Sequence, residues 1–353
     1  MNHTGDSGDR GDAPTSEDDG HVGRTEQLGQ VVALAGGVGG AKLARGLQDA
    51  LPPGALAVVV NTADDFRLWG LHISPDLDTV MYTLAGIANP ATGWGIADDT
   101  WNALDMLARY GQDTWFRLGD RDLATHILRT HMLAEGYTLT EVTDHLSGAL
   151  GVPTRILPMC DEPVHTLVHT PHGVLEFQDY FVRRRHADEV TGVSFRGIER
   201  AQPTRQVLQA VHSARHIIFC PSNPFVSIGP ILALPGFRQA LGRSAAIRVA
   251  VSPIVGGAAI KGPAADMLRT LGHEVSPVGV AAIYRGLIHG MVIDRIDAPL
   301  APRITDMGIA VQISDTIMED AQSRTALALE VLDFCRRLSG HLTPSHDYHN
   351  QPA

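Results

Sequence analysis

The sequence has few cysteines and no long apolar run. Its three cysteines, Cys160, Cys220 and Cys335, lie far apart and form no CxxC pair, which argues against a zinc knuckle or a disulfide framework. Such sparse cysteines are compatible with a reducing compartment, so we expect a cytoplasmic location. No uninterrupted apolar stretch reaches transmembrane length, and a hydrophobic content of 44% is ordinary for a soluble globular protein. We therefore expect no membrane partner.

Positive charge is also scarce. The formal net charge is -11, from 28 Lys and Arg residues against 39 Asp and Glu residues. The basic residues are neither in excess nor gathered on one stretch, apart from RRRH at 183–186, which we interpret as a solvated strand end. Because a nucleic-acid-binding surface needs a concentrated basic patch, no nucleic-acid partner is expected.

Several catalytic signatures are missing. The chain contains no nucleophile elbow, no HExxH pair and no convincing catalytic triad. Its 17 histidines are scattered, and an isolated imidazole is more often a satisfied core or surface group than a ligand. We therefore expect chemistry that uses no covalent nucleophile.

Apolar runs that end in polar clusters indicate the fold. VVALAGGVGGAKLARGL (31–47) runs from a strand through glycines into a helix, and ALAVVVNTADD (55–65) is the next strand. Further strands are predicted in HIIFCPSNP, IRVAVSPIVGG, HEVSP, GMVIDRID and IAVQIS, and a long helix follows the last of these. The predicted fold class is α/β: a Rossmann-like, mostly parallel sheet with helices on both faces, formed by residues 29–93 and 151–340.

Other segments depart from this pattern. Residues 94–150 show helical spacing without a strand-like run, which predicts a small all-helical insert. PHG at 171–173 is a credible hairpin turn in a strand-rich stretch. Residues 1–28 are acidic and rich in Gly, Asp and Ser, so we predict a disordered leader. Residues 341–353 are predicted to be a loose tail.

The glycine-rich turn after the first strand is typical of phosphate-binding turns. Glycine permits a close backbone approach and a positive φ, and the following helix offers unpaired N–H groups. It is not a Walker A motif, because Lys42 is followed by Leu43 and no hydroxyl is available for Mg²⁺. It is not a clean dinucleotide fingerprint either, because Lys42 stands where a small residue should pack. A purely structural tight turn is the alternative.

Aspartates gather in the loop after the second strand. Asp64, Asp65, Asp76 and Asp78 fall within NTADDFRLWGLHISPDLD, and we place Asp78 at the start of a helix that begins near Thr79. One acid here would suit a ribose hydroxyl, but carboxylates grouped beside a phosphate-binding turn are what Mg²⁺-assisted phosphoryl transfer needs. The alternative is a solvated acidic loop with helix caps, in which Asp78 is an N-cap.

Three later segments add polar groups. FRLGDRD (116–122) on its own favours a surface salt-bridge turn. PSNPFVSIGPIL (221–232) follows a strand and offers small hydroxyl and amide groups that suit a nucleoside or phosphate. SPIVGGAAIKGPAADML (252–268) is a second glycine-rich loop entering a helix, with Lys261 free to meet an anion. Two such loops in one sheet indicate two phosphates or two ligands.

Taken together, the motifs GGVGGAKL, NTADD, GLHISPDLDTVMYTL, LGDRDLATH, PSNPFVSIGPIL and SPIVGGAAIKGPA resemble the 2-phospho-L-lactate transferase family of coenzyme F420 biosynthesis. The resemblance runs in order from about Val31 to Cys335. It implies a Rossmann-like core with a small helical insert. It also implies Mg²⁺-dependent transfer of a phospho-lactyl or phosphoenolpyruvyl group from a guanosine-diphosphate-activated donor to the ribityl hydroxyl of the deazaflavin Fo (7,8-didemethyl-8-hydroxy-5-deazariboflavin), with GMP as the leaving group.

The resemblance also implies roles for individual residues. Asp78 and Arg117 would contact the acceptor. Asp78 and Asp76 would be catalytic, and Asp65 and Asp76 would hold Mg²⁺. The implied donor-binding residues are Gly36, Gly37, Gly39, Gly40, Lys42, Ser222, Asn223, Ser227, Ser252, Gly256, Gly257 and Lys261.

A competing class shares this fold. The gluconeogenesis-factor family of nucleotide-sugar-binding regulators has a similar glycine loop but carries out no transfer. SPDLD and LGDRD, which belong to acceptor and metal chemistry, favour the transferase, and a nicotinamide oxidoreductase is less favoured because its fingerprint fails at Lys42. The GGVGG form of the glycine loop leans toward a phosphoenolpyruvate donor. The three-carbon acid, a homodimeric state and the basis of guanine selectivity stay open, with Asp315 as a candidate reader of the guanine N–H edge.

Overall fold

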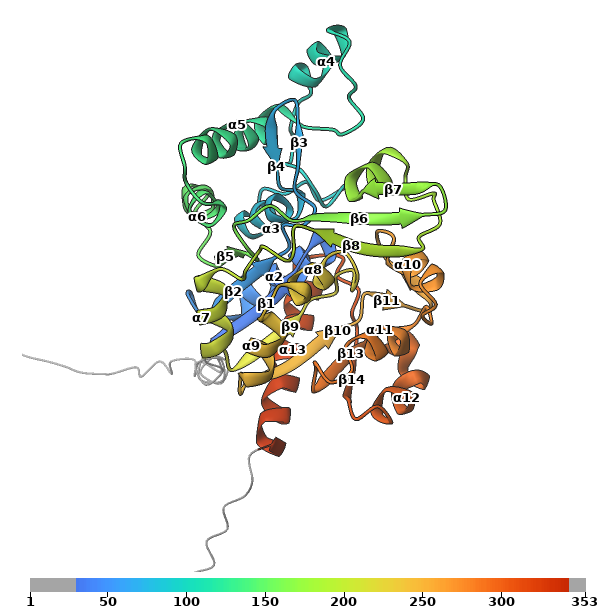
Figure 1. Ribbon diagram of the computed structural model, residues 1–353. Coiled ribbons are helices and arrows are strands. Elements are labelled where there is room, and N and C mark those ends of the chain that lie inside the picture. The colour runs from blue at the N-terminus through green and yellow to red at the C-terminus, as the bar shows by residue number, and fades with distance from the viewer. Residues whose placement is uncertain (1–29, 343–353) are drawn as a thin grey trace, which may run out of the picture.

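The computed structural model describes residues 30–342 and contains a seven-stranded parallel sheet (Figure 1). The strand order along the sheet is β5-β2-β1-β9-β10-β13-β14, and every neighbouring pair is parallel. The order runs outward in both directions from the β1–β9 pair, which confirms the predicted Rossmann-like α/β class. The strands are β1 (Val31–Ala35), β2 (Leu56–Val60), β5 (Arg155–Pro158), β9 (His216–Phe219), β10 (Ile247–Val251), β13 (Gly290–Asp294) and β14 (Ala310–Ser314).

Both faces of this sheet are buried, which explains the uninterrupted apolar runs. All five residues of β1 are fully buried, and alternate side chains enter different layers. Val31, Ala33 and Ala35 join one core cluster. Val32 and Leu34 join the other. A strand covered on both sides needs apolar residues at every position, not only at alternate ones.

Helices form one layer on each face. One layer contains α2 (Gly37–Ala50), α3 (Pro75–Ala85), α6 (Leu139–Ala149) and α13 (Ala321–Leu342). The opposite layer contains α7 (Arg205–Ser213), α8 (Ile228–Ala233), α9 (Phe237–Arg243), α11 (Pro277–Ile283) and α12 (Ala301–Thr305). The remaining short elements near the second layer are α10 (Ala264–Thr270), η3 (Arg295–Leu300), β11 (Ile254–Val255) and β12 (Ala258–Ala259).

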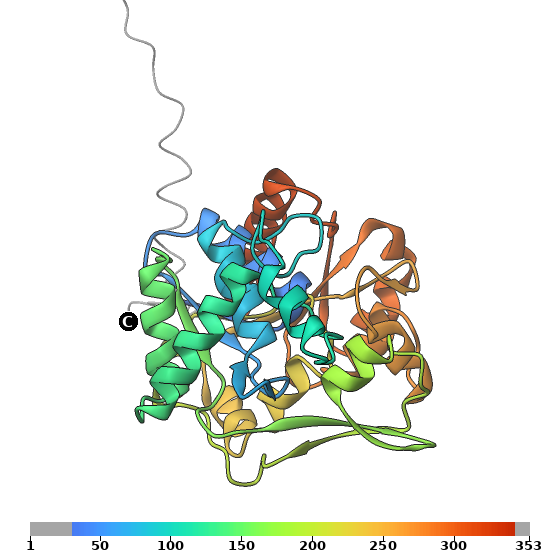
Figure 2. The same cartoon turned by 90° about the horizontal axis from the view of Figure 1, so that it is seen from above.

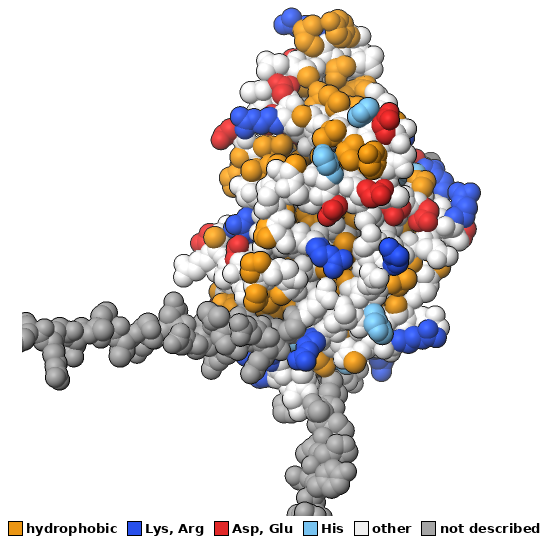
Figure 3. All heavy atoms as spheres, turned by 90° about the vertical axis from the view of Figure 1, so that its left-hand side faces the viewer, with side chains coloured by type: hydrophobic (Ala, Val, Ile, Leu, Met, Phe, Trp, Pro, Cys, Tyr) orange, Lys and Arg blue, Asp and Glu red, His pale blue; other side chains and the backbone are white. Residues whose placement is uncertain are grey.

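The predicted helical insert contains three helices, α4 (Asn102–Arg109), α5 (Asp120–Ala134) and α6. Helices α4 and α5 project from the top of the molecule beside the hairpin of β3 (Phe66–Leu68) and β4 (Leu71–Ile73), whereas α6 packs against the sheet (Figure 1). Hydrophobic side chains are exposed over this upper region (Figure 3). Met106, Tyr110 and Ile127 of the insert are exposed hydrophobic residues. The division into domains stays a prediction.

A second, antiparallel sheet has the order β7-β6-β8. Figure 2 shows it along one edge of the molecule, opposite α13. Thr170 pairs with Gly173 across a two-residue turn, which confirms the predicted hairpin. The sheet elements and the π-helix that follows β7 are β6 (His165–Thr170), β7 (Gly173–Glu176), β8 (Gly192–Arg196) and η2 (Asp179–Arg183).

Some local predictions were wrong. HEVSP forms no strand, because Ser276 caps α11 by accepting hydrogen bonds from the amides of Val278 and Gly279. The RRRH cluster is not a strand end, since it spans the end of η2 and a turn in which Arg185 and His186 have positive φ. Helix α13 extends to Leu342 into the predicted tail, and residues 343–353, like the predicted leader 1–28, lie outside the described residues. Within residues 30–342, no helix is both long and apolar enough to cross a membrane.

Candidate functional site

The predicted glycine turn and the PSNP loop meet at the switch point of the sheet. Gly36 directly follows β1 and Ser222 lies just beyond β9, the two central strands. The hydroxyl of Ser222 donates to the carbonyl of Gly36 at 2.9 Å and accepts from its amide at 3.3 Å. In an open parallel sheet, ligands bind outside the carboxyl ends of the strands at such a point. The structure therefore brings these two predicted donor loops together.

The glycines of this turn are required by neighbouring protein atoms. A Cβ at Gly36 would lie 2.5 Å from a carboxylate oxygen of Asp76, and a Cβ at Gly39 would lie 2.3 Å from the carbonyl oxygen of Pro221. A Cβ at Gly40 would lie 2.6 Å from the hydroxyl oxygen of Ser222. Helix α2 thus packs tightly against the loop after β9. A purely structural role, the alternative to phosphate binding, therefore explains part of the need for glycine in this turn.

Gly37 has a backbone conformation that favours glycine, with φ of 63°. Its amide donates to Asp76 Oδ1 at 2.7 Å, so a carboxylate of the protein occupies the anion position at this N–H. The other amides of the first turn of α2 have no carbonyl partner within the helix. Unpartnered amides at a helix N-terminus are the groups with which such turns bind anions.

All four predicted aspartates are buried at the carboxyl end of β2 and the start of α3. Asp64, Asp65, Asp76 and Asp78 are each at most 8% exposed, which rules out a solvated acidic loop. Burial raises the pKa of Asp64 well above its ordinary value, and the nearby Asp76 charge raises it further. Burial also raises the pKa of Asp76 to about 6, against hydrogen bonds from Asn61 and Gly37 that lower it. We call these four residues the acid cluster.

Two oxygens of the acid cluster lack partners. Oδ1 of Asp64 and Oδ1 of Asp65 are buried and accept no hydrogen bond from the described residues. The other oxygen of Asp65 accepts from the hydroxyl of Ser74 at 2.7 Å and lies 3.0 Å from Nε2 of His72. A buried carboxylate oxygen without a partner is unfavourable, so a cation or donor group that reached either atom would stabilise it.

Asp78 is not an N-cap. Helix α3 begins at Pro75 with Ser74 as its N-cap residue, so Asp78 lies inside the helix, and the predicted helix start near Thr79 was too late. Proline fits the first helical position because its missing N–H is not needed there. Arg129 of α5 binds both carboxylate oxygens of Asp78, with Nη1 3.1 Å from Oδ2 and Nη2 in contact with Oδ1.

The alternating charges of the LGDRD segment had indicated a surface salt-bridge turn. The structure shows instead that the segment is partly buried. Asp122 is buried, accepts a hydrogen bond from the Tyr82 hydroxyl at 2.7 Å, and lies 3.3 Å from Nε2 of His126. Asp120 instead caps α4: its carboxylate accepts from the Thr100 hydroxyl and from amides at the start of α4, which lower its pKa to about 2.

One group of candidate metal ligands lies close together among the described residues. Single atoms of Asp78, Asp122 and His126 all lie within 4.8 Å of one another, but the guanidinium of Arg129 already supplies the positive charge there. The predicted metal ligands Asp65 and Asp76 belong to no group of three that converges this closely in residues 30–342.

The role of Arg129 and the burial of Asp122 and His126 were not predicted from the sequence. A signal was present, because spacings of four and three residues place Asp122, His126 and Arg129 on one face of a helix. Nothing local, however, indicated that this face meets Asp78 on α3.

Several predicted donor residues stabilise loops. Oδ1 of Asn223 accepts from the amides of Phe225 and Val226, as an Asx turn does. The hydroxyl of Ser252 donates to the carbonyl of Ile254. Ser227 starts α8, and its Cβ lies close to Gly36. Ser227 therefore faces the glycine turn, while Asn223 and Ser252 shape the loops around it.

The second glycine-rich loop does not enter a helix directly. Gly256 and Gly257 form the two-residue tip of the β11–β12 hairpin, and both have positive φ, as this kind of turn requires. The amide of Gly256 donates to Asp297 Oδ2 at 3.0 Å. Helix α10 starts only at Ala264, so the predicted anion site at its N-terminus is not formed by these glycines.

The two predicted lysines lie near each other at the outer side of α2. Nζ of Lys42 donates to the carbonyl of Met318, and Nζ of Lys261 donates to the carbonyl of Thr92. Burial lowers the pKa of Lys42, and the neighbouring charges of Lys261 and Arg324 lower it further. Cations that repel one another in this way are suited to an anionic ligand between them.

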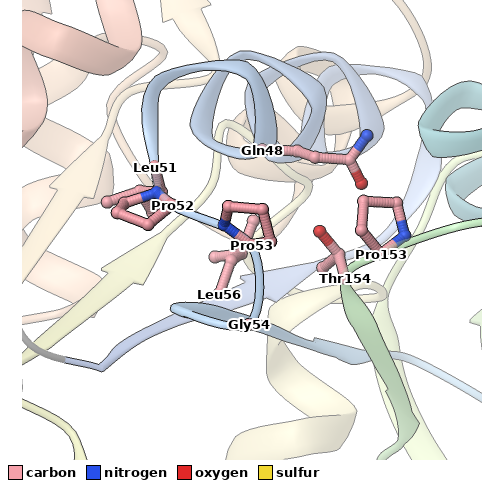
Figure 4. Close-up of a pocket in the computed structure, with 8 residues that line it drawn as sticks. All are labelled: Gln48, Leu51, Pro52, Pro53, Gly54, Leu56, Pro153 and Thr154. Carbon is pink, nitrogen blue, oxygen red and sulfur yellow. The ribbon is translucent and has the colours of Figure 1, made fainter. Parts of the chain in front are cut away.

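Two remaining predicted residues lie on the surface. The guanidinium of Arg117 stacks on the ring of Trp101 at 4.2 Å, within the insert. Asp315 pairs with Arg295 at 2.8 Å and is 77% exposed. A small pocket lined by prolines and Leu56 lies at the amino end of β2 (Figure 4), opposite the acid cluster, and takes no part in the candidate site.

A doubly wound parallel sheet with a glycine-rich turn and buried carboxylates at its switch point defines a Rossmann-like, ligand-binding α/β protein. Residues 31–331 match the family model of 2-phospho-L-lactate transferase CofD, so the chain belongs to this transferase family. The resemblance stated from the motifs is confirmed.

Relatives with assigned names agree with this family. The chain is 42% identical over 315 residues to a phosphoenolpyruvate transferase from Streptomyces griseus, covering 88% of this chain and 99% of that protein. It is 39% identical over 298 residues to a 2-phospho-L-lactate transferase from Methanosarcina mazei, covering 84% of this chain and 98% of that protein.

A solved structure shares the fold. A member of the UPF0052 family from Bacillus halodurans superposes with a TM-score of 0.56 at 15% identity, covering 85% of this chain and 98% of that one. At this identity the similarity shows the fold alone.

Proposed function

We propose that the protein transfers a phosphoenolpyruvyl or phospho-lactyl group from a GDP-activated donor to the ribityl hydroxyl of Fo, in a reaction that depends on Mg²⁺. The hydroxyl oxygen forms a bond to the phosphorus that carries the three-carbon acid. The anhydride bond to the second phosphorus breaks, and GMP leaves. The hydroxyl proton passes to a base of the acid cluster or to solvent. The product is F420-0 or its dehydro form.

The buried charges carry this proposal. Five carboxyl groups lie buried in the acid cluster and its neighbour Asp122, but Arg129 is the only buried Lys or Arg among the described residues. Burial raises the pKa of Asp64 and Asp76, the charge of a neighbouring carboxylate raises each further, and one oxygen each of Asp64 and Asp65 has no hydrogen-bond partner. A divalent cation would supply positive charge here, and carboxylate oxygens are the ligands that Mg²⁺ prefers.

The acid cluster offers oxygen ligands of the kind that Mg²⁺ takes. Asp65 and Asp76 would hold it, as the resemblance implies, and Asp64 offers a further oxygen. Because these three carboxylates do not converge to within 4.8 Å of one another, water molecules would complete the ligands of the bound ion. When bound, Mg²⁺ neutralises charge on the transferring phosphoryl group. The protein's own contribution is to position the reactants: the amides of α2 and the lysines would bind the diphosphate, while Asp78 and Arg117 would orient the hydroxyl.

Only the GGVGG form of the glycine turn favours phosphoenolpyruvate as the three-carbon acid that the donor carries. Relatives of both names are about equally similar to the chain, at 42% and 39% identity, so overall identity does not separate the two acids. The cytoplasmic location and a homodimeric state stay predictions.

A direct assay tests the proposal. The purified protein is incubated with Fo, Mg²⁺ and each guanylated acid in turn, and the product mass and the released GMP are measured. We expect one GMP for each deazaflavin phosphodiester and loss of turnover in excess chelator. Binding of the guanylated ligand without any turnover would support a regulator instead, and full activity in chelator would contradict the Mg²⁺ dependence.

A further inference from the structure

A buried guanidinium contacts the carboxylate of Asp78. Arg129, on insert helix α5, is 1% exposed and contacts both oxygens of the Asp78 carboxylate. Two N–H groups from one planar guanidinium fix both the position and the plane of a carboxylate, which a single ammonium cannot do. The two residues are 51 positions apart, so this contact ties the insert to helix α3.

Arg129 is itself held in place. Its Nη1 lies 3.2 Å from Nδ1 of His126, and because a guanidinium only donates, Nδ1 accepts and the ring proton lies on Nε2. Nε2 lies 3.3 Å from Asp122 Oδ1, in contact but without the geometry of a hydrogen bond, and Asp122 accepts from Tyr82. Tyr82 belongs to α3 as Asp78 does, so the contacts form a closed ring between the two helices.

The same helix reaches a second member of the acid cluster. The hydroxyl of Thr130 accepts from the amide of His72 at 2.8 Å, and Nε2 of His72 lies 3.0 Å from Asp65. Adjacent residues of α5 therefore contact, directly or through one side chain, the carboxylates of Asp78 and Asp65. A change in the position of α5 would move both.

We infer that Arg129 is a positioning residue that fixes the Asp78 carboxylate for the reaction, so that the helical insert sets the geometry of the acid cluster. The role of Asp78 in turnover rests on the proposed function. A buried ion pair is an inefficient way to stabilise a fold, because desolvation opposes the attraction between the charges. Its value at this place is a single orientation of a carboxylate at the edge of the candidate site.

A double-mutant cycle tests the inference. The proteins are the wild type, Arg129→Lys, Asp78→Asn and the double variant, with Arg109→Lys, an exposed arginine of α4, as the matched control. Arg129→Lys keeps the charge but loses the two-pronged contact. We expect kcat to fall by roughly 10-fold or more with little change in KM for the donor, because small misplacements of a reacting group can cost about 10²-fold.

Non-additivity is the decisive kinetic result. In the Asp78→Asn background, Arg129→Lys should cost far less, because no carboxylate is left to be positioned. Equal losses in both backgrounds, a rise in KM alone, or an unchanged kcat would overturn the inference. Arg109→Lys should behave as the wild type.

Thermal melting separates this inference from folding defects and from the proposed function. If Arg129→Lys lowers the melting temperature, the double variant should melt no lower than the worse single variant, since each single change leaves its partner mismatched. Additive lowering would contradict the pairing. Absence of turnover in the wild type counts against the proposed function, and the melting cycle then still decides whether Arg129 fixes Asp78.

Discussion

At the residue scale, the glycines after β1 are set by the protein's own packing as much as by any ligand. Gly39 was predicted to bind the donor. In the structure, the space beside Gly39 is filled by the backbone carbonyl of Pro221. A backbone atom cannot turn away as a flexible side chain can, so a substitution here must move α2 or the loop after β9.

Gly39→Ala should therefore destabilise the fold before it affects any one ligand. Its Cβ would lie 2.3 Å from the Pro221 oxygen, and overpacking of this kind costs about 1–3 kcal/mol. Gly148→Ala in α6 is the matched control, because its Cβ meets no atom within 4 Å, and a gain of up to ~1 kcal/mol is expected there. Denaturant unfolding of both variants measures the difference. A wild-type free energy of unfolding for Gly39→Ala would contradict the packing argument.

At the scale of elements, β9 contains a buried histidine at its first residue. Burial, with the charges of Arg215 and Arg336, lowers the pKa of His216 from its ordinary 6.5 to about 4. The folded state thus holds the imidazole neutral, whereas the unfolded chain protonates it below about pH 6.5. The resulting stability is complete above that pH and is lost as the pH falls from 6.5 toward 4.

Removal of this imidazole should flatten the acid side of the stability profile. Between pH 6.5 and 4, the free energy of unfolding of His216→Leu should fall by about 3 kcal/mol less than that of the wild type. Each unit of pKa shift corresponds to about 1.4 kcal/mol. Melting temperatures or denaturant midpoints across this range measure it. His172→Leu, at the exposed tip of the β6–β7 hairpin, is the control and should keep the wild-type slope. Parallel profiles for His216→Leu and the wild type would contradict this assignment.

The elements best predicted from sequence were those with one strong local signal. The strands of the parallel sheet are apolar at every position because both faces are covered, and the PHG hairpin has a two-residue turn. HEVSP misled because a single apolar residue, Val275, lies between a polar pair and a capping serine. The start of α3 was placed too late, near Thr79, although Pro75 suits the first position of a helix.

The candidate site was predictable only in part, because its contacts join distant segments. That aspartates follow β2 is visible in the sequence, and their burial follows from the sheet edge where they lie. The contact between Arg129 and Asp78 depends on how α5 packs against α3, and no local sequence pattern specifies that packing. Likewise, Gly256 and Gly257 read as an anion loop, but pairing of β11 with β12 makes them a hairpin tip.

At the scale of the whole molecule, the strand order brings buried carboxylates together at the carboxyl ends of the central strands, where too few cationic side chains lie to neutralise them. The loops after β1, β2 and β9 and the start of α3 all meet there, held by hydrogen bonds between Gly36 and Ser222 and between Gly37 and Asp76. A divalent cation bound at this edge would stabilise the folded state and not the unfolded one. Stability should therefore depend on Mg²⁺ even in the absence of substrates.

This dependence can be measured without turnover. Mg²⁺ at about 100 times its Kd should add roughly 2.7 kcal/mol to the free energy of unfolding, and excess chelator should remove it. Asp65→Asn with Asp76→Asn should abolish the Mg²⁺-dependent part, because amides bind the ion far more weakly than carboxylates do. Asp315→Asn is the matched control, since Asp315 is exposed and pairs with Arg295 away from the acid cluster. An equal gain from NaCl at the same ionic strength, or a gain that persists in the double variant, would show that Mg²⁺ acts by general screening or at another place.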